Sequence, residues 1–119
     1  MSEIRATTIS DAAGTGPITL TGQSAAKAWA TLGGSFEILD SFNVSSSSDL
    51  GTANSQITYT NSLTGNPSAS VEADASTAAA WFTSIDSLGT STASAVTFNT
   101  SGSLIDGRPT YYIVAGDLA

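Results

Sequence analysis

The stretch Gln56-Ile57-Thr58-Tyr59-Thr60 alternates polar and apolar side chains without a break. Successive side chains of a β-strand point to opposite faces, so this period predicts a strand whose buried face carries Ile57 and Tyr59. Residues 36–44 are the most strand-like segment of the chain, and we expect them to form a hairpin with this strand. The serine-rich run 45–51 is then expected to be the loop between the two.

The segment 36–44 also carries an irregularity. Four of its apolar side chains share one parity and are expected on one face of a single strand: Phe36, Ile38, Phe42 and Val44. Leu39 alone opposes them. Asp40 interrupts the series, which indicates a bulge or an edge strand, because a polar residue is tolerated there more readily than in a central strand.

Residues 25–32 are also expected to form a strand, because Gly33 and Gly34 end the segment after only about two helical turns. Alternation then divides the side chains between two faces. One face carries Ala28, Ala30 and Leu32, and the other carries Lys27, Trp29 and Thr31.

The remaining segments also consist of short strand-like runs separated by turn residues. We expect two short strands within 5–20, a turn at 63–67, strands at 68–73, 95–99 and 110–115, and a turn at 102–107, while 78–82 stays open between strand and helical turn. About eight short strands, with turn signals roughly every 8–12 residues, predict an all-β, antiparallel β-sandwich of the jelly-roll or immunoglobulin-like kind. A length of 119 residues fits one domain.

Composition excludes several classes of function. Three Lys and Arg stand against ten Asp and Glu, for a net charge of −7, and clustered cations for nucleic acid or an anionic membrane are missing. The absence of His and Cys removes imidazole bases, thiolate nucleophiles and the usual zinc ligands. Glu72 and Asp74 lie two residues apart, yet no calcium-binding loop surrounds them. We therefore expect no enzyme, and no catalytic, cofactor-binding or metal-binding residues.

Several motifs follow one another in a specific order: Lys27-Ala28-Trp29, the Gly33-Gly34 turn, Ser41-Phe42-Asn43-Val44-Ser45-Ser46, and Val96 to Asp106 leading into Thr110 to Gly116. This order and spacing resembles modules of tail-fibre and appendage proteins of tailed bacteriophages. The resemblance covers most of 25–117. Two departures stand out, since Leu32-Gly33-Gly34 replaces the family's aromatic-Asn-Gly turn and residues 67–76 match no part of the pattern.

The resemblance implies a non-enzymatic structural protein of the virion, here as a free-standing, homotrimeric accessory protein that decorates or stabilises the capsid. The alternative that it implies is a tail-fibre or tail-tip adhesin for host attachment, which binds glycans of the host surface. The expected partners are further copies of the chain, the major capsid or tail proteins, and host polysaccharide. The chain would be made in the host cytoplasm and lie on the capsid surface or the tail, with residues 1–24 as an arm or attachment strand.

Aromatic side chains are the candidate contact residues. Trp29 with Lys27 on one strand face would form a platform for a sugar or a subunit, and the competing interpretation is a Trp29 that fills the core with the Lys27 stem along it. Trp81 and Phe82 are the second pair, with the same two interpretations. The terminal strands, 5–9 and 110–115, are expected to offer open edges to a neighbouring subunit.

Overall fold

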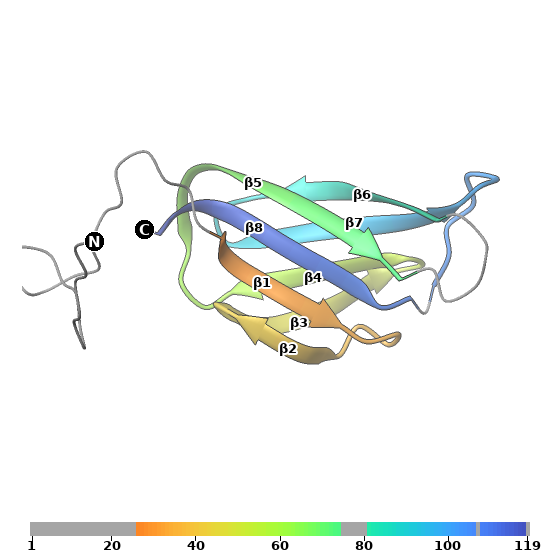
Figure 1. The fold of residues 1–119 in the computed structure, drawn as a ribbon, viewed down its shortest axis with the longest axis horizontal. Coiled ribbons are helices and arrows are strands. Elements are labelled where there is room, and N and C mark those ends of the chain that lie inside the picture. Colours follow the sequence, from red (N-terminus) through yellow and green to blue (C-terminus); the bar gives the residue numbers. More distant parts are fainter. Residues whose placement is uncertain (1–25, 75–80, 107, 119) are drawn as a thin grey trace, which may run out of the picture.

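The computed structural model describes residues 26–74, 81–106 and 108–118. In these ranges the chain forms eight β-strands and no helix, which confirms the predicted all-β sandwich (Figure 1). The strands are β1 (Ala26–Leu32), β2 (Ile38–Phe42), β3 (Val44–Gly51), β4 (Asn54–Tyr59), β5 (Leu63–Ala73), β6 (Trp81–Leu88), β7 (Thr92–Asn99) and β8 (Thr110–Leu118). The predicted strands within 5–20, the arm 1–24 and residues 78–80 lie outside the described part.

The strands form two antiparallel sheets of four, in the orders β2-β1-β8-β5 and β3-β4-β7-β6. Neighbours in sequence pair as β1–β2, β3–β4 and β6–β7, while β1 and β8 pair at the centre of the first sheet. The chain therefore changes sheet after β2, β4, β5 and β7. The two layers lie one behind the other in Figure 1.

The core lies between the inner faces of the two sheets. Its buried hydrophobic residues are Ala28, Ala30, Leu32, Phe36, Ile57, Tyr59, Leu63, Ala93, Ala95, Tyr112 and Val114. Ile57 and Tyr59 are buried as the alternation predicts, and the burial of Ile57 contributes about 1.5–3 kcal/mol. The predicted division of the β1 side chains between two faces is likewise confirmed, and the face with Ala28, Ala30 and Leu32 is the buried one.

A buried hydrogen-bond pair joins the two layers. The Tyr112 hydroxyl of β8 donates to the Ser55 carbonyl oxygen of β4 at 2.9 Å, and lies 2.8 Å from Ser55 Oγ. Because the phenol has one proton to donate, the Ser55 hydroxyl is the donor in the second bond. Burial raises the pKa of Tyr112 to about 12. The bonded pair holds the sheets in one relative position.

The predicted single strand over 36–44 is wrong, because two strands of different sheets share these residues. Asn43 separates β2 from β3 with a left-handed backbone, φ 54°, which asparagine tolerates better than most residues. Its Nδ2 donates to the carbonyl oxygens of Lys27 and Asn61, both at 3.0 Å, and its Oδ1 accepts from the Asn61 amide at 2.7 Å. These bonds stabilise the point at which the chain changes sheet.

The side-chain pattern of β2 is set by a bulge. Thr31 pairs with Asp40 and Leu32 pairs with Ile38, so Leu39 is the extra residue. The sequence indicated a bulge or an edge strand at Asp40, and both are found: the bulge is at the neighbouring Leu39, and β2 is an edge strand. A shift of one residue exchanges the faces of a strand, so Phe42 points outward and is 54 % exposed. The expectation that Phe42 shares the inner face with Ile38 is therefore wrong.

The predicted loop at 45–51 is also wrong. This serine-rich run lies in β3, which pairs with β4 along its length, while β2 pairs with β1 instead of forming the expected hairpin. Most side chains of β3 are exposed on an edge strand, so burial imposes no apolar period that a sequence analysis could detect.

Two further expectations need correction. The turn predicted at 63–67 lies within β5, as a register shift between Thr64 and Ser68 around Gly65 with φ 66°. The strand predicted at 110–115 exists, but β8 lies between β1 and β5 and offers no open edge. Among the described strands, the sheet edges are β2, β5, β3 and β6. The strands expected at 68–73 and 95–99 are confirmed within β5 and β7.

Candidate functional site

The outer face of the sheet β2-β1-β8-β5 carries a row of apolar side chains. Trp29 pairs with Phe42 on one side and with Ile113 on the other, and residues directly opposite each other project from the same face. Ile113 is 56 % exposed, and Tyr111 lies two residues before it on the same face. We call Trp29, Phe42, Tyr111 and Ile113 the aromatic face.

Polar side chains surround the aromatic face. The next row across the sheet contains Asp40, Thr31, Tyr111 and Glu72, in that order. Its two carboxylates belong to the edge strands β2 and β5, while Lys27 lies two residues before Trp29 on β1. Strands in a sheet are about 4.8 Å apart, so each row spans about 14 Å. An apolar centre with a charged rim is the usual anatomy of a contact surface.

Trp29 and Lys27 share one face of β1, as the alternation predicts, and the structure shows that this is the outer face. Both are half-buried and neither belongs to the core, so the interpretation of Trp29 as a core residue is wrong.

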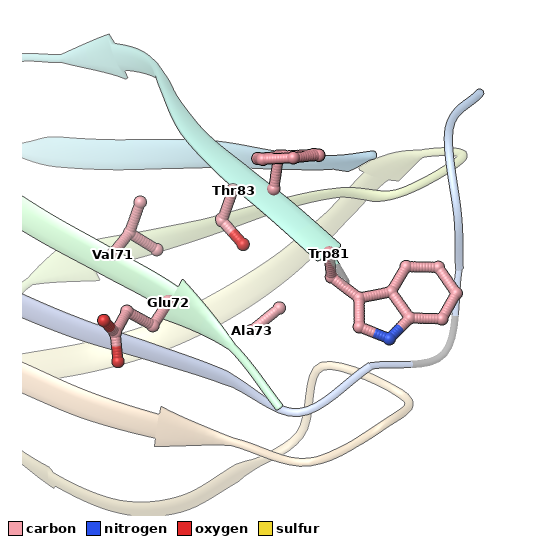
Figure 2. Close-up of a pocket in the computed structure, with 6 residues that line it drawn as sticks. Val71, Glu72, Ala73, Trp81 and Thr83 are labelled. Carbon is pink, nitrogen blue, oxygen red and sulfur yellow. The ribbon is translucent and has the colours of Figure 1, made fainter. Parts of the chain in front are cut away.

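A cleft opens on the side of the sandwich where the edge strands β5 and β6 approach each other. It has a volume of about 410 Å³ and is lined by Val71, Glu72, Ala73, Trp81, Phe82 and Thr83. We call it the seam cleft. Figure 2 shows Val71 and Ala73 on β5 and Thr83 on β6, with Trp81 at one end of the cleft. Glu72 leaves β5 on the opposite side from Val71 and Ala73, at the outer lip.

The two aromatic residues of the cleft differ in their surroundings. Trp81 is half-buried, and the guanidinium carbon of Arg108 lies 4.4 Å from its ring centroid, a cation–π contact of about 0.5–1 kcal/mol. Its indole Nε1 is buried and has no hydrogen-bond partner among the described residues. Phe82 is 60 % exposed and pairs with Phe98 on the outer face of the second sheet.

The four residues singled out from the sequence thus fall into two places. Trp29 belongs to the aromatic face and Lys27 lies beside it on β1, while Trp81 and Phe82 line the seam cleft between β5 and β6. The sequence analysis missed Tyr111 and Ile113, although their alternation with the buried Tyr112 and Val114 is a signal for an outer position.

The outer face of the second sheet is polar at its centre. Asn54 and Gln56 of β4 project outward beside Ser94 of β7, whose hydroxyl donates to Asp86 Oδ2 at 3.3 Å. Asn54 Nδ2 donates to the same oxygen at 3.4 Å. Asp86 occupies a register shift in β6, which places its carboxylate over this surface.

Two searches of the described residues give negative findings. No three His, Cys, Asp or Glu side chains gather in a way that would hold a metal ion. No described helix is long and apolar enough to cross a membrane. Comparison of the chain with protein-family models, curated proteins and solved structures finds no match.

Proposed function

We propose that this chain is a non-enzymatic structural protein of a tailed-bacteriophage particle. It assembles as a homotrimer on the particle surface, contacts neighbouring virion subunits through the aromatic face, and thereby decorates or stabilises the capsid. The observation that carries the proposal is the apolar row Phe42, Trp29 and Ile113 at the centre of a sheet surface. Exposed apolar groups that are contiguous and rimmed by charge mark interaction sites in globular proteins.

The energetics favour covering this face. Each large apolar side chain that leaves water contributes about 1.5–3 kcal/mol when it is fully buried. Phe42 and Ile113 are each more than half exposed in the single chain, so most of this contribution is still to be gained in an assembly. Trp and Tyr are also the residue types that dominate the binding energy of interfaces, and the face contains Trp29 and Tyr111.

The sheet edges support an assembled state. Natural β-proteins block open edges with lysine, proline or bulges. The only lysine of the chain, Lys27, lies on the inner strand β1, and among the described edge strands β2 has a bulge and β5 has Pro67. The long edge strand β3 has register shifts near both ends, but Val44–Gly51 contains neither lysine nor proline, and residues 46–49 pair regularly with β4. A neighbouring subunit would cover such edges.

The resemblance to phage tail-fibre and appendage modules also supports a role on the virion. The motifs that carry it, Lys27-Ala28-Trp29 and Ser41 to Ser46, lie on and beside the aromatic face: Trp29 and Phe42 belong to them. The alternative role, an adhesin that binds host glycans, is favoured by a separate observation, the seam cleft with its two aromatic residues.

Immunogold electron microscopy of intact virions, with antiserum against the purified chain, tests the proposal. Label over the head supports capsid decoration, and particles depleted of the chain should then break at lower temperature with unchanged host adsorption. Label confined to the tail supports the adhesin instead. Absence of label from every particle contradicts both roles.

A further inference from the structure

We propose that β3 pairs edge to edge with β3 of a second copy of the chain. The two strands lie antiparallel about a twofold axis at Ser48, so the sheets β3-β4-β7-β6 of both copies form one continuous sheet. This inference rests on the proposed function in one respect, namely that the chain assembles with further copies of itself. It adds a twofold contact, which joins one trimer to another and lies on the opposite sheet from the aromatic face.

β3 has the properties of a strand that accepts a further strand. It is an edge of its sheet and lies beside β2, an edge of the other sheet, along the lower side of the molecule in Figure 1. Six of its eight residues are exposed, and the strand contains no lysine or proline. Residues 46–49 pair with β4 without a register shift. A regular, exposed edge without such blocking residues is a template for a further strand.

The hydrogen bonds of β4 show which backbone groups of β3 are directed to the open edge. The N–H and C=O groups of successive strand residues point to alternate sides of the strand. The Thr60 amide donates to the Asn43 carbonyl oxygen, toward β3, at 3.1 Å. The Tyr59 amide donates to the Ser91 carbonyl oxygen, toward β7, at 2.9 Å. By the same alternation, the backbone groups of Gln56 point toward β3.

The backbone groups that face the open edge therefore belong to Ser47 and Asp49. Ser48 lies between them and is the partner of Gln56, so its own backbone groups point toward β4. In an antiparallel pair centred on Ser48, Ser47 of one copy faces Asp49 of the other, and the two residues exchange both N–H···O=C bonds. The twofold axis repeats this exchange on the other side of Ser48.

The side chains of β3 are complementary to themselves in the same register. Ser47 is opposite the buried Ile57, so Ser47 and Asp49 lie on the inner side of the sheet and Ser48 lies on the outer side. The Ser47 hydroxyl of one copy is then a donor opposite the Asp49 carboxylate of the other, and a hydrogen bond to an ionised acceptor is stronger than a neutral one. The two carboxylates do not face each other. This self-complementarity is the reason for a second copy of the chain as the partner.

A single introduced thiol reports on this contact, because the chain has no cysteine. The two Ser48 residues form a non-hydrogen-bonded pair across the axis, with Cα atoms about 4.5 Å apart, which a disulfide can bridge. The two Ser46 residues lie about 14 Å apart in this register, too far for a disulfide. Ser84 is an exposed serine on the outer face of β6, the opposite edge of the sheet. Ser46→Cys and Ser84→Cys are therefore matched controls for Ser48→Cys.

Each cysteine variant of the full chain would be oxidised in a glutathione buffer, and the products would be separated by mass under denaturing conditions. A pair of short strands is a small interface, so chain concentrations of about 0.01–1 mM are needed. We expect Ser48→Cys to form two-chain products at least about tenfold faster than either control.

Light scattering over the same concentrations tests the contact without a covalent bond. The mass of the unchanged chain should rise above that of a trimer as the concentration increases. Ser48→Lys should weaken this association about tenfold, because two like charges then face each other across the axis, whereas Ser84→Lys should leave it unchanged. Circular dichroism checks that each variant is folded, and all of these substitutions are at exposed positions.

Two results would overturn the inference. The first is that Ser48→Cys forms cross-links no faster than the two controls, and the second is that Ser48→Lys associates as strongly as the unchanged chain. Ile113→Asp, which removes the aromatic-face contact, separates this inference from the proposed function. Cross-links that form while trimers are absent contradict the proposed function alone. Trimers that persist without cross-links through Ser48→Cys contradict this inference alone.

Discussion

The two outer faces of this sandwich differ although one alternation rule builds both. On the sheet β2-β1-β8-β5 the central outward positions hold Trp29 and Ile113, while on the sheet β3-β4-β7-β6 they hold Gln56 and Ser94. The aromatic side chains on the outer face of the second sheet lie at its end, where Phe82 pairs with Phe98. Packing in the core requires apolar residues only at the inward positions of a strand. The residue types at the outward positions therefore depend on whether that face contacts water or a partner.

The polar outer face finds part of its hydrogen-bond partners within the chain. Asp86 accepts hydrogen bonds from Asn54 and Ser94, while Asn54 Oδ1 is buried without a hydrogen-bond partner among the described residues. The aromatic face has no such partners for its apolar groups, because only removal from water stabilises them. Polar groups of one face thus have hydrogen-bond partners within the chain, whereas the apolar groups of the other face gain free energy only when a partner covers them.

A charge placed at the centre of each face should separate them most strongly. Ile113→Asp buries an unpaired carboxylate in the proposed interface, at a cost of about 3–5 kcal/mol, and should convert the assembly to monomers. Gln56→Asp, at the equivalent central position of the other sheet, should leave the oligomeric state unchanged. Light scattering coupled to size exclusion measures both, and a trimer that survives Ile113→Asp would show that the aromatic face is not the contact.

The point at which the chain passes from one sheet to the other is the next target. Asn43→Ala loses four side-chain hydrogen bonds and places alanine at φ 54°, and should destabilise the fold by about 2–3 kcal/mol. Asn43→Gly accepts the backbone angle and still loses the bonds, so its loss should be smaller. Urea denaturation gives both values. Equal stability of Asn43→Ala and the wild-type chain would contradict this account.

Alkaline pH should destabilise the interior between the two faces. Burial raises the pKa values of Tyr59 and Tyr112 to about 12, from 10.0. Between pH 10 and 12 the unfolded chain has therefore lost phenolic protons that the folded chain still holds, so the free energy of unfolding falls as pH rises. It is unaffected by these groups below pH 10. Thermal unfolding across pH 8–12 measures the decline, which Tyr112→Phe should make shallower.

The smallest effect is expected on the polar face. Asp86→Asn keeps the shape of the side chain and alters two long hydrogen bonds, at 3.3 and 3.4 Å, on an exposed carboxylate. The free energy of unfolding should change by no more than about 0.5 kcal/mol, with no change in oligomeric state. Urea denaturation tests the first expectation. A large loss of stability would show that the hydrogen bonds of Asp86 contribute more to the stability of the fold than we expect.

The sequence analysis succeeded where a strand has one buried face and no irregularity. The alternation of Ala28, Ala30 and Leu32 with Lys27, Trp29 and Thr31 identified β1 but not which face is buried, and the pattern around Ile57 identified β4. It failed in β3, where Ser45 to Ser48 lie on an exposed edge strand and burial leaves no pattern. The pairing of β1 with β8 was also beyond it, since strand order depends on contacts between distant segments.

The candidate sites show the same division. Lys27 and Trp29, and separately Trp81 and Phe82, were identifiable as neighbours because each pair is close in sequence. Their companions were not: Ile113 joins Trp29 only through the β1–β8 register. Likewise, Glu72 joins Phe82 only because the edges of two different sheets meet at the seam cleft.

The sequence by itself determined the all-β class, through its period of two, and it excluded histidine, cysteine and cation-cluster chemistry through composition. The tertiary structure alone decided which side chains meet outside the core. A bulge at Leu39 turns Phe42 outward, and the left-handed Asn43 sends the next strand into the other sheet. The period of the hydrophobic residues indicates only which side chains are buried. Register and sheet order arise from backbone hydrogen bonds between segments that are distant in sequence. These bonds bring Phe42, Trp29 and Ile113 into one row.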